Sequence, residues 1–322
     1  MTVLITGATG FVGSALIKHL LLDNYRLTAA VLPGEKSEHL PVTIKRGIVE
    51  PLSEFSDYTS ELQNIDIVIH LAARVHVMQE TATDSLQEFR KVNLHGTKRL
   101  ARQAAKAGVK RFVFMSTIGV NGDNSGDKPY TEGDIPHPHN PYSVSKYEAE
   151  LALRQISIET GMEVVIIRAP LVYGPGNPGN FLSLLRIVSK GRPLPLASIR
   201  NHRSLIFVGN LVDALATCAT HPAAAGKTYL VSDGEDVSTP ELIRRTASAL
   251  GVPVRLFLTP VSLMKLVGKL TGKSGALNRL TGSLTVDSLK IRQELEWVPP
   301  FTMVEGLAET AGWFNNQIKG QS

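Results

Sequence analysis

Two side chains four residues apart have the types needed for proton transfer. Tyr142 and Lys146 follow Pro141, a residue suited to the first turn of a helix. On a helix, this spacing places both side chains on one face. A nearby ammonium group favours a phenolate, so we expect Lys146 to lower the pKa of Tyr142. The Tyr142 hydroxyl is then expected to exchange a proton with a substrate hydroxyl or ketone near neutral pH.

Two hydroxyl residues end an apolar run that we expect to be a buried strand. Ser116 and Thr117 follow the run from Phe112 to Met115. Doubly wound sheets place their ligands at the carboxyl ends of the strands. The hydroxyl residues at this strand end favour a catalytic role for Tyr142 and Lys146. Without them, the pair would be interpreted as an ordinary solvated helix face.

Three glycines follow the first apolar run, Val3 to Ile5, and precede a helical stretch from Ala15 to Leu22. A tight strand-to-helix turn needs unusual dihedral angles, and a pyrophosphate must approach bare backbone. Backbone N–H groups and the helix dipole then hold the anion. The predicted cofactor contacts in this turn are Gly7, Thr9, Gly10, Phe11, Val12 and Gly13.

Short apolar runs alternate with helical stretches, notably 85–106 and 142–160, which predicts an α/β fold of the Rossmann type with a doubly wound parallel sheet. The chain becomes loop-rich after Arg168, and the apolar runs at 204–208 and 228–232 are expected to return to the sheet. We predict a dinucleotide-binding domain over 1–170 that takes back about 204–235. Residues 171–203 and 236–322 then form a smaller C-terminal substrate-binding lobe.

Composition limits the function classes. Apolar residues make up 43% of the 322 residues, which excludes wholesale disorder, and the lone cysteine, Cys218, excludes a disulfide framework. No apolar stretch reaches about 18 residues, so we expect a cytoplasmic protein without an integral membrane segment. A net charge of +5, spread along the chain, suits an anionic small molecule better than nucleic acid.

Together, the motifs resemble the extended short-chain dehydrogenase/reductase family, in the NAD-dependent epimerase/dehydratase branch that acts on nucleotide sugars. The resemblance covers nearly the whole chain. It rests on Thr6-Gly7-x-x-Gly10-x-x-Gly13, His70-Leu71-Ala72-Ala73, Asn93 with Gly96-Thr97, Ser116-Thr117, Tyr142-x-x-x-Lys146, Arg168-Ala169-Pro170, Tyr173-Gly174-Pro175 and Arg203 before Val208.

The resemblance implies roles for individual residues. Thr117 would polarise the reacting oxygen with Ser116 beside it, and Lys146 would also hydrogen-bond the nicotinamide ribose. Asn93 is expected to tie backbone segments together rather than touch substrate. Further implied cofactor contacts are Ile48, Val49, Leu71, Ala72, Ala73 and Pro170. A homodimer through the helices at 85–106 and 142–160 is also implied.

Departures from the family pattern narrow the chemistry. Ile118 and Gly119 stand where sugar 4,6-dehydratases carry an Asp-Glu pair, which disfavours elimination of water. Cys218 lies in an apolar run and is expected in the core, which disfavours epimerisation at C3 and C5. The second strand ends in Val31-Leu32-Pro33 without a carboxylate. Lys36 would suit a 2′-phosphate, although Glu35 could reach back, so the predicted cofactor is NADP or NAD, with NADP favoured.

On the substrate side, Arg203 and Arg279 are expected to hold a diphosphate, and Asn180 to contact the diphosphate or the sugar. No metal is expected, because His137 and His139 lack further ligands at fitting spacing. The basic stretch Lys265, Lys269 and Lys273 predicts an amphipathic helix. We interpret it as packed on the lobe, with contact to a membrane surface as the alternative.

The sequence therefore predicts an oxidoreductase or epimerase acting at C4 of a UDP-hexose or UDP-N-acetylhexosamine. A 4-ketoreductase with exchangeable NADP(H) is slightly preferred over a 4-epimerase with bound NAD. Residues 71–78 and 297–300 resemble bacterial surface-polysaccharide enzymes. A reductase of a hydrophobic ketone and a non-catalytic dinucleotide sensor remain as alternatives.

Overall fold

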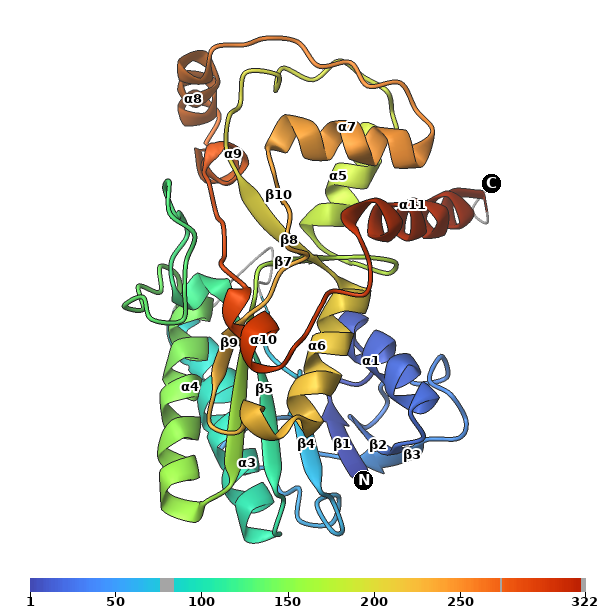
Figure 1. The fold of residues 1–322 in the computed structure, drawn as a ribbon, viewed down its shortest axis with the longest axis vertical. Coiled ribbons are helices and arrows are strands. Elements are labelled where there is room, and N and C mark those ends of the chain that lie inside the picture. The colour runs from blue at the N-terminus through green and yellow to red at the C-terminus, as the bar shows by residue number, and fades with distance from the viewer. Residues whose placement is uncertain (76–83, 273, 320–322) are drawn as a thin grey trace.

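The computed structural model describes residues 1–75, 84–272 and 274–319. Residues 76–78 of one resemblance motif, and Lys273, lie outside these ranges. Figure 1 shows a layered α/β part at one end of the molecule and a smaller part that carries α5, α7, α8, α9 and α11 at the other.

The larger part is built on a seven-stranded sheet in the order β3-β2-β1-β4-β5-β6-β9. Every neighbouring pair in this sheet is parallel. The predicted doubly wound sheet of the Rossmann type is confirmed. Its strands are β1 (Thr2–Thr6), β2 (Arg26–Val31), β3 (Lys45–Ile48), β4 (Ile67–His70), β5 (Arg111–Thr117), β6 (Glu163–Ala169) and β9 (Thr228–Leu230).

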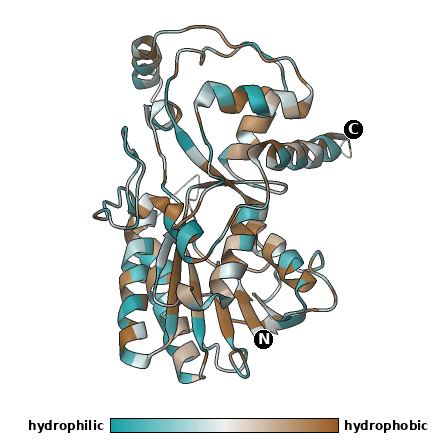
Figure 2. Cartoon of the chain, in the orientation of Figure 1, coloured by the Kyte–Doolittle hydropathy of each residue, from teal (hydrophilic) through white to brown (hydrophobic). Residues whose placement is uncertain are grey.

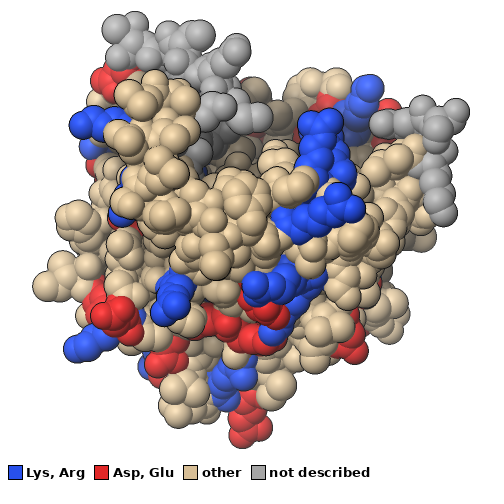
Figure 3. Space-filling model, turned by 90° about the horizontal axis from the view of Figure 1, so that it is seen from above, with Lys and Arg blue, Asp and Glu red and all other residues tan. Residues whose placement is uncertain are grey.

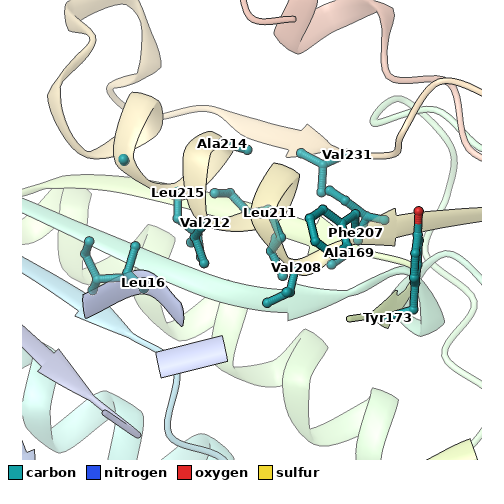
Figure 4. Close-up of a cluster of buried hydrophobic side chains, with 14 of the residues drawn as sticks. Leu16, Ala169, Tyr173, Phe207, Val208, Leu211, Val212, Ala214, Leu215 and Val231 are labelled. Carbon is teal, nitrogen blue, oxygen red and sulfur yellow. The ribbon is translucent and has the colours of Figure 1, made fainter. Parts of the chain in front are cut away.

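Helices cover both faces of this sheet because successive strand residues point to opposite sides. Val113 packs in one core with α1 (Phe11–Leu22) and α6 (Val208–Thr220). Its neighbour Phe112 packs in a second core with α3 (Thr97–Lys106) and α4 (Pro141–Thr160). The central parts of the strands are accordingly hydrophobic, with hydrophilic residues near some strand ends, whereas the helices alternate (Figure 2). Figure 4 shows side chains of α6 in the first core.

The helix predicted over 85–106 is interrupted. It consists of α2 (Ser85–Arg90), a π-helical turn (Lys91–Gly96) and α3. A Cβ added at Gly96 would lie 2.8 Å from Leu52 Cβ, so the turn needs glycine for close packing. In this turn the Asn93 amide donates to the backbone oxygen of Arg74 at 3.0 Å and accepts from its N–H at 2.8 Å. The predicted backbone-tying role of Asn93 is confirmed.

The smaller part has its own three-stranded sheet, in the order β10-β8-β7. Here the prediction for residues 204–208 is wrong. The strand β8 pairs in parallel with β7 and antiparallel with β10, and only β9 returns to the large sheet. An apolar run fits either sheet equally well, so the hydrophobicity of residues 204–208 could not predict which strand they pair with. The strands are β7 (Leu171–Tyr173), β8 (Arg203–Phe207) and β10 (Asp236–Val237).

The remaining helices lie in or next to this part, except Leu289–Glu294 (α10), which lies beside β9 of the large sheet (Figure 1). They are α5 (Asn180–Val188), α7 (Thr239–Leu250), α8 (Val261–Leu270), α9 (Ser274–Thr281), α10 (Leu289–Glu294) and α11 (Met303–Lys319), with 3-10 turns at Ile118–Val120 and Pro222–Ala224. One carboxylate links the two parts through hydrogen bonds. Asp233 accepts from the Tyr173 hydroxyl at 2.9 Å, the Phe207 N–H at 2.8 Å and the Asn210 amide at 2.7 Å. The Tyr173 hydroxyl stands out in Figure 4.

A fully buried histidine ties β4 to its neighbours. His70 Nδ1 lies 2.6 Å from the Thr6 hydroxyl oxygen, and Nε2 lies 2.9 Å from that of Thr97. Burial lowers the pKa of His70 to about 3, with a smaller contribution from the charge of Lys146. The imidazole is therefore neutral in the folded protein throughout the pH range in which proteins are usually handled.

We predict that His70 makes folding stability pH-dependent. Its folded pKa is depressed below the unfolded value of about 6.5, so the unfolded chain binds an extra proton between these two values. Stability is fully present above about pH 6.5 and falls as the pH drops toward 3, by up to about 1.4 kcal/mol per pH unit from this group. Urea denaturation of wild type and His70→Gln across this range measures the effect.

The His70→Gln variant should lose the part of the pH dependence of unfolding free energy that His70 contributes. The matched control is His137→Gln, at an exposed position, which should keep the wild-type slope. An unchanged pH slope in His70→Gln would contradict the prediction.

Candidate functional site

A cavity of about 670 Å³ opens at the carboxyl ends of β1, β2, β4 and β5. This is the edge at which parallel sheets bind ligands. Most of the predicted cofactor residues line it. These are Gly7, Thr9, Gly10, Phe11, Val12, Gly13, Val49, Leu71, Ala72, Ala73, Tyr142 and Lys146.

The glycines of the first turn are required by close backbone approaches. Gly7 has φ +67°, and a Cβ there would lie 2.8 Å from the Ala72 nitrogen. A Cβ at Gly13 would lie 2.1 Å from the Gly7 oxygen. The turn therefore exposes bare backbone at the start of α1, where N–H groups and the helix dipole suit a pyrophosphate. This cradle fits a dinucleotide.

A carboxylate does face the cavity at the end of β2. Glu35 accepts from the Leu32 N–H at 2.8 Å and from the Thr9 hydroxyl, and it lines the cavity. Lys36 is exposed and is not among the lining residues. The strand end itself, Val31 to Pro33, carries no carboxylate, and the alternative in which Glu35 reaches back is the one found, because the chain turns after Pro33. Strand residues alone did not show that reversal.

Two other predicted cofactor residues do not line the cavity. Ile48 is 60% exposed, whereas its neighbour Val49 is buried and lines the cavity. Adjacent residues of an extended segment point in opposite directions, which accounts for the difference. Pro170 follows the last residue of β6 and is likewise absent from the lining.

Lys146 reaches the cavity from inside the protein. Its side chain is buried, and Nζ lies 3.9 Å from the centre of the Phe114 ring, a cation–π contact. Burial lowers the pKa of Lys146 to about 7, and the negative charge of Glu150 opposes that shift. The amine is therefore poised to change protonation state near neutrality.

Tyr142 stands one turn before Lys146 on the same face of α4, and its ring lies edge-on to Phe89 at 6.0 Å between centroids. The expected direction of its pKa shift is wrong for this structure. Burial raises the pKa of Tyr142 to about 12. The cost of removing a phenolate from water exceeds any gain from Lys146, whose ammonium lies against Phe114 instead.

The two hydroxyl residues at the end of β5 have different surroundings. Ser116 lines the cavity, but its hydroxyl donates to Glu150 Oε1 at 2.5 Å. Thr117 is not among the lining residues, and its hydroxyl oxygen accepts from the Gly119 N–H at 3.2 Å. That bond uses a lone pair of Oγ1 and leaves the O–H able to donate.

A buried ion pair supports the catalytic helix from behind. The guanidinium of Arg168 donates to both oxygens of Glu150, at 3.0 and 2.7 Å, and both side chains are buried. Arg168 also donates to the Asn121 amide oxygen at 2.9 Å. Glu150 lies one turn after Lys146 on α4, so this pair links α4 to β6 beneath the site.

Of the residues predicted to bind substrate, Ser116 lines this cavity, and three others are not brought to it. Asn180 is the exposed first residue of α5, and Arg279 is exposed on α9. The guanidinium of Arg203 donates to the backbone oxygens of Arg279 at 2.6 Å and Gly282 at 3.3 Å. It thereby fastens β8 to the end of α9. The roles of these three residues in substrate binding stay predictions.

Other lining residues were not predicted. Arg74 and Val75 directly follow the Leu71–Ala73 motif, so extending that motif would have found them. Val92 lies in the π-helical turn, for which the sequence carries no signal. The full set is Thr6, Ala30, Leu32, Glu35, Pro51, Leu52, Tyr58, Arg74, Val75, Val92, Met115 and Pro178.

Within the described residues, no group of three His, Cys, Asp or Glu side chains has the arrangement of a metal site. Across the same residues, no helix is long and apolar enough to cross a membrane. Cys218 is buried in α6, as predicted from its apolar surroundings.

Comparison with known proteins identifies the family. The model of the NAD-dependent epimerase/dehydratase family matches residues 3–232. The chain belongs to this family. A curated relative, the UDP-glucose 4-epimerase of Vibrio cholerae, is 43% identical over 97% of this chain and 95% of its own length.

Solved structures of the epimerase/dehydratase family have the same fold. MoeE5, solved in complex with UDP-glucose and NAD, is 26% identical, covers 99% of this chain and 100% of its own, and has a TM-score of 0.78. The UDP-glucose 4-epimerase of Thermotoga maritima is 22% identical, with coverages of 99% and 100% and a TM-score of 0.77, and shows the fold alone. The family is NAD-dependent, and the Vibrio cholerae relative acts on a nucleotide sugar. These relatives do not support the preference for a ketoreductase.

We predict that Glu150→Gln lowers the free energy of unfolding of this epimerase-family protein by about 3 kcal/mol, because it leaves the Arg168 charge buried without its partner. Glu159→Gln on the same helix is the matched control. Its partner is Arg102 in a largely exposed ion pair, so the loss should be at most about 1 kcal/mol. Urea denaturation measures both, and equal losses would contradict a special role for the buried pair.

Proposed function

We propose that the protein is a nucleotide-sugar 4-epimerase that holds NAD, with UDP-glucose the first substrate to test. The observation that carries the choice of cofactor is Glu35, whose carboxylate lines the cavity at the end of β2, whereas the exposed Lys36 is not among the lining residues. A carboxylate here suits the adenosine ribose hydroxyls of NAD and repels the 2′-phosphate of NADP. An epimerase returns its cofactor to the starting state in each cycle and gains from holding it.

The similar proteins also support a 4-epimerase that holds NAD. The Vibrio cholerae relative is a UDP-glucose 4-epimerase, and MoeE5 was solved with UDP-glucose and NAD. The preference for a ketoreductase assumed that no carboxylate lies at the end of β2 and that Lys36 faces the cavity. Glu35 lies there instead, and Lys36 is not among the lining residues.

In this proposal each residue has a defined task. Bound NAD supplies the hydride acceptor and donor. Tyr142 exchanges the proton of the sugar C4 hydroxyl, and Thr117 donates a hydrogen bond to the same oxygen. Lys146, with a pKa near 7, holds the ribose and sets the charge beside Tyr142. The smaller part of the molecule binds the nucleotide sugar through Arg203, Arg279 and Asn180.

The homodimer also remains a proposal. On α4, Leu151 is 46% exposed and Ile158 is 80% exposed. These apolar side chains leave that helix able to pack against a second copy, as four-helix contacts between protomers require.

We predict that Tyr142→Phe lowers turnover at least about 10²-fold, the usual scale for loss of a positioned acid or base. The substitution removes only the hydroxyl, so circular dichroism and NAD content should stay at wild-type levels. Tyr147→Phe, on the same helix and outside the cavity lining, is the control and should keep normal turnover. Near-normal epimerisation by Tyr142→Phe would overturn the assignment. Wild-type binding of NAD without turnover on any nucleotide sugar would favour the sensor.

We predict that NAD is released when freshly purified protein is denatured, and that UDP-glucose is converted to its C4 epimer without added cofactor. Glu35→Ala should weaken NAD binding about tenfold or more, the scale of a charge-assisted hydrogen bond. Glu38→Ala, at an exposed neighbouring position, is the control. Activity that consumes NADPH stoichiometrically, with no unassisted inversion, would replace the epimerase by the 4-ketoreductase.

A further inference from the structure

The helix α8 lies at the far end of the smaller part (Figure 1). It presents an apolar stripe to solvent. Leu263, Leu266, Val267 and Leu270 are 49, 54, 51 and 78% exposed. Their spacing of i, i+3, i+4 and i+7 places them along one face of the helix. Met264 and Gly268, on another face, are the buried positions, and α8 packs against α9. The stripe is therefore the side of α8 that the protein leaves uncovered.

Cationic side chains flank this stripe. Lys265 and Lys269 are exposed, lie one turn apart on α8, and form no ion pair within the part of the chain that the structure describes. The sequence from Thr246 to Val286 contains no Asp or Glu. Its basic residues are Arg255, Lys265, Lys269, Lys273 and Arg279.

The segment before α8 extends the apolar surface. Phe257 is 50% exposed and Leu258 is 79% exposed. Figure 3 looks onto the end of the molecule that carries α7 and α8. It shows a broad area of uncharged side chains, with Lys and Arg crossing it and Asp and Glu gathered beside it. An uncovered apolar area with positive charges at its margin is typical of an interaction surface.

We propose that the α8 surface, Phe257 to Leu270, binds the headgroup region of an anionic lipid bilayer, with α8 lying in the plane of the membrane. The apolar stripe enters the boundary between headgroups and acyl chains, and the Lys265 and Lys269 ammonium groups reach the lipid phosphates. This inference does not depend on the proposed reaction.

Charge decides between a bilayer and a second copy of the chain. Two α8 surfaces placed face to face would gather four lysine charges at one contact, and residues 246–286 offer no carboxylate to pair with them. An anionic bilayer supplies both the apolar interior and the opposite charge. One short helix gives weak, reversible attachment rather than permanent anchoring.

The test is co-sedimentation of the full-length protein with vesicles. We expect binding to vesicles that contain phosphatidylglycerol, at least about tenfold weaker binding to pure phosphatidylcholine, and release from the anionic vesicles by high salt. Failure to bind phosphatidylglycerol vesicles at low salt would overturn the proposal.

Variants assign the binding to α8. The double variants Leu266→Ser with Leu270→Ser, and Lys265→Gln with Lys269→Gln, should each weaken binding at least about tenfold. Replacing both lysines by arginine should preserve it. Leu22→Ser is the matched control, because Leu22 is 81% exposed at the end of α1. Thermal melting checks that each variant is folded.

Three results with these variants would overturn the proposal. The first is wild-type vesicle binding by both double variants. The second is a lower molar mass by light scattering in the α8 leucine variant, which would assign the surface to a second copy. The third is a raised KM for UDP-glucose in that variant without vesicles, which would assign α8 to closure over the substrate.

Discussion

A single buried carboxylate balances two buried cations in this protein. Glu150 is fully buried and lies between Arg168, which takes both of its oxygens, and Lys146, which it reaches only through its charge. Arg168 and the Ser116 hydroxyl donate hydrogen bonds to Glu150, and the Lys146 ammonium lies against the face of Phe114. Burial lowers the pKa of Lys146 to about 7, and the charge of Glu150 opposes that shift. The stability of the fold and the protonation state of the site therefore depend on the same carboxylate.

The sheet places these groups where a ligand meets them. Ser116 and Arg168 are paired residues on neighbouring strands β5 and β6, and α4 crosses above them with Glu150 and Lys146. The glycine turn after β1 and the Leu71–Ala73 segment after β4 then form the opposite wall of the cavity. Each wall is supported by a core of its own, one with α1 and α6 and one with α3 and α4. Rigid packing on both faces keeps the cavity residues in place.

The smaller part of the molecule is built differently. Its sheet has three short strands, and one nitrogen of the Arg203 guanidinium donates to backbone oxygens near α9. Several of the large hydrophobic side chains that the protein exposes lie between residues 254 and 280. The family match covers residues 3–232, whereas α8 lies beyond it and is a surface feature that neither the cavity nor the core explains.

The sequence alone determined the features that depend on short-range spacing. The glycines after β1, the Tyr142 and Lys146 pair one turn apart, and the alternation of strands and helices all follow from local geometry, so the fold class and much of the cavity lining were predictable. Tertiary structure decided whatever depends on which segments meet. The reversal that turns Glu35 into the cavity, the pairing of β8 with β7, and the burial that raises the pKa of Tyr142 involve contacts between distant residues. Residue types do not encode such contacts, because an apolar run or a carboxylate suits several partners and only the packed chain selects one.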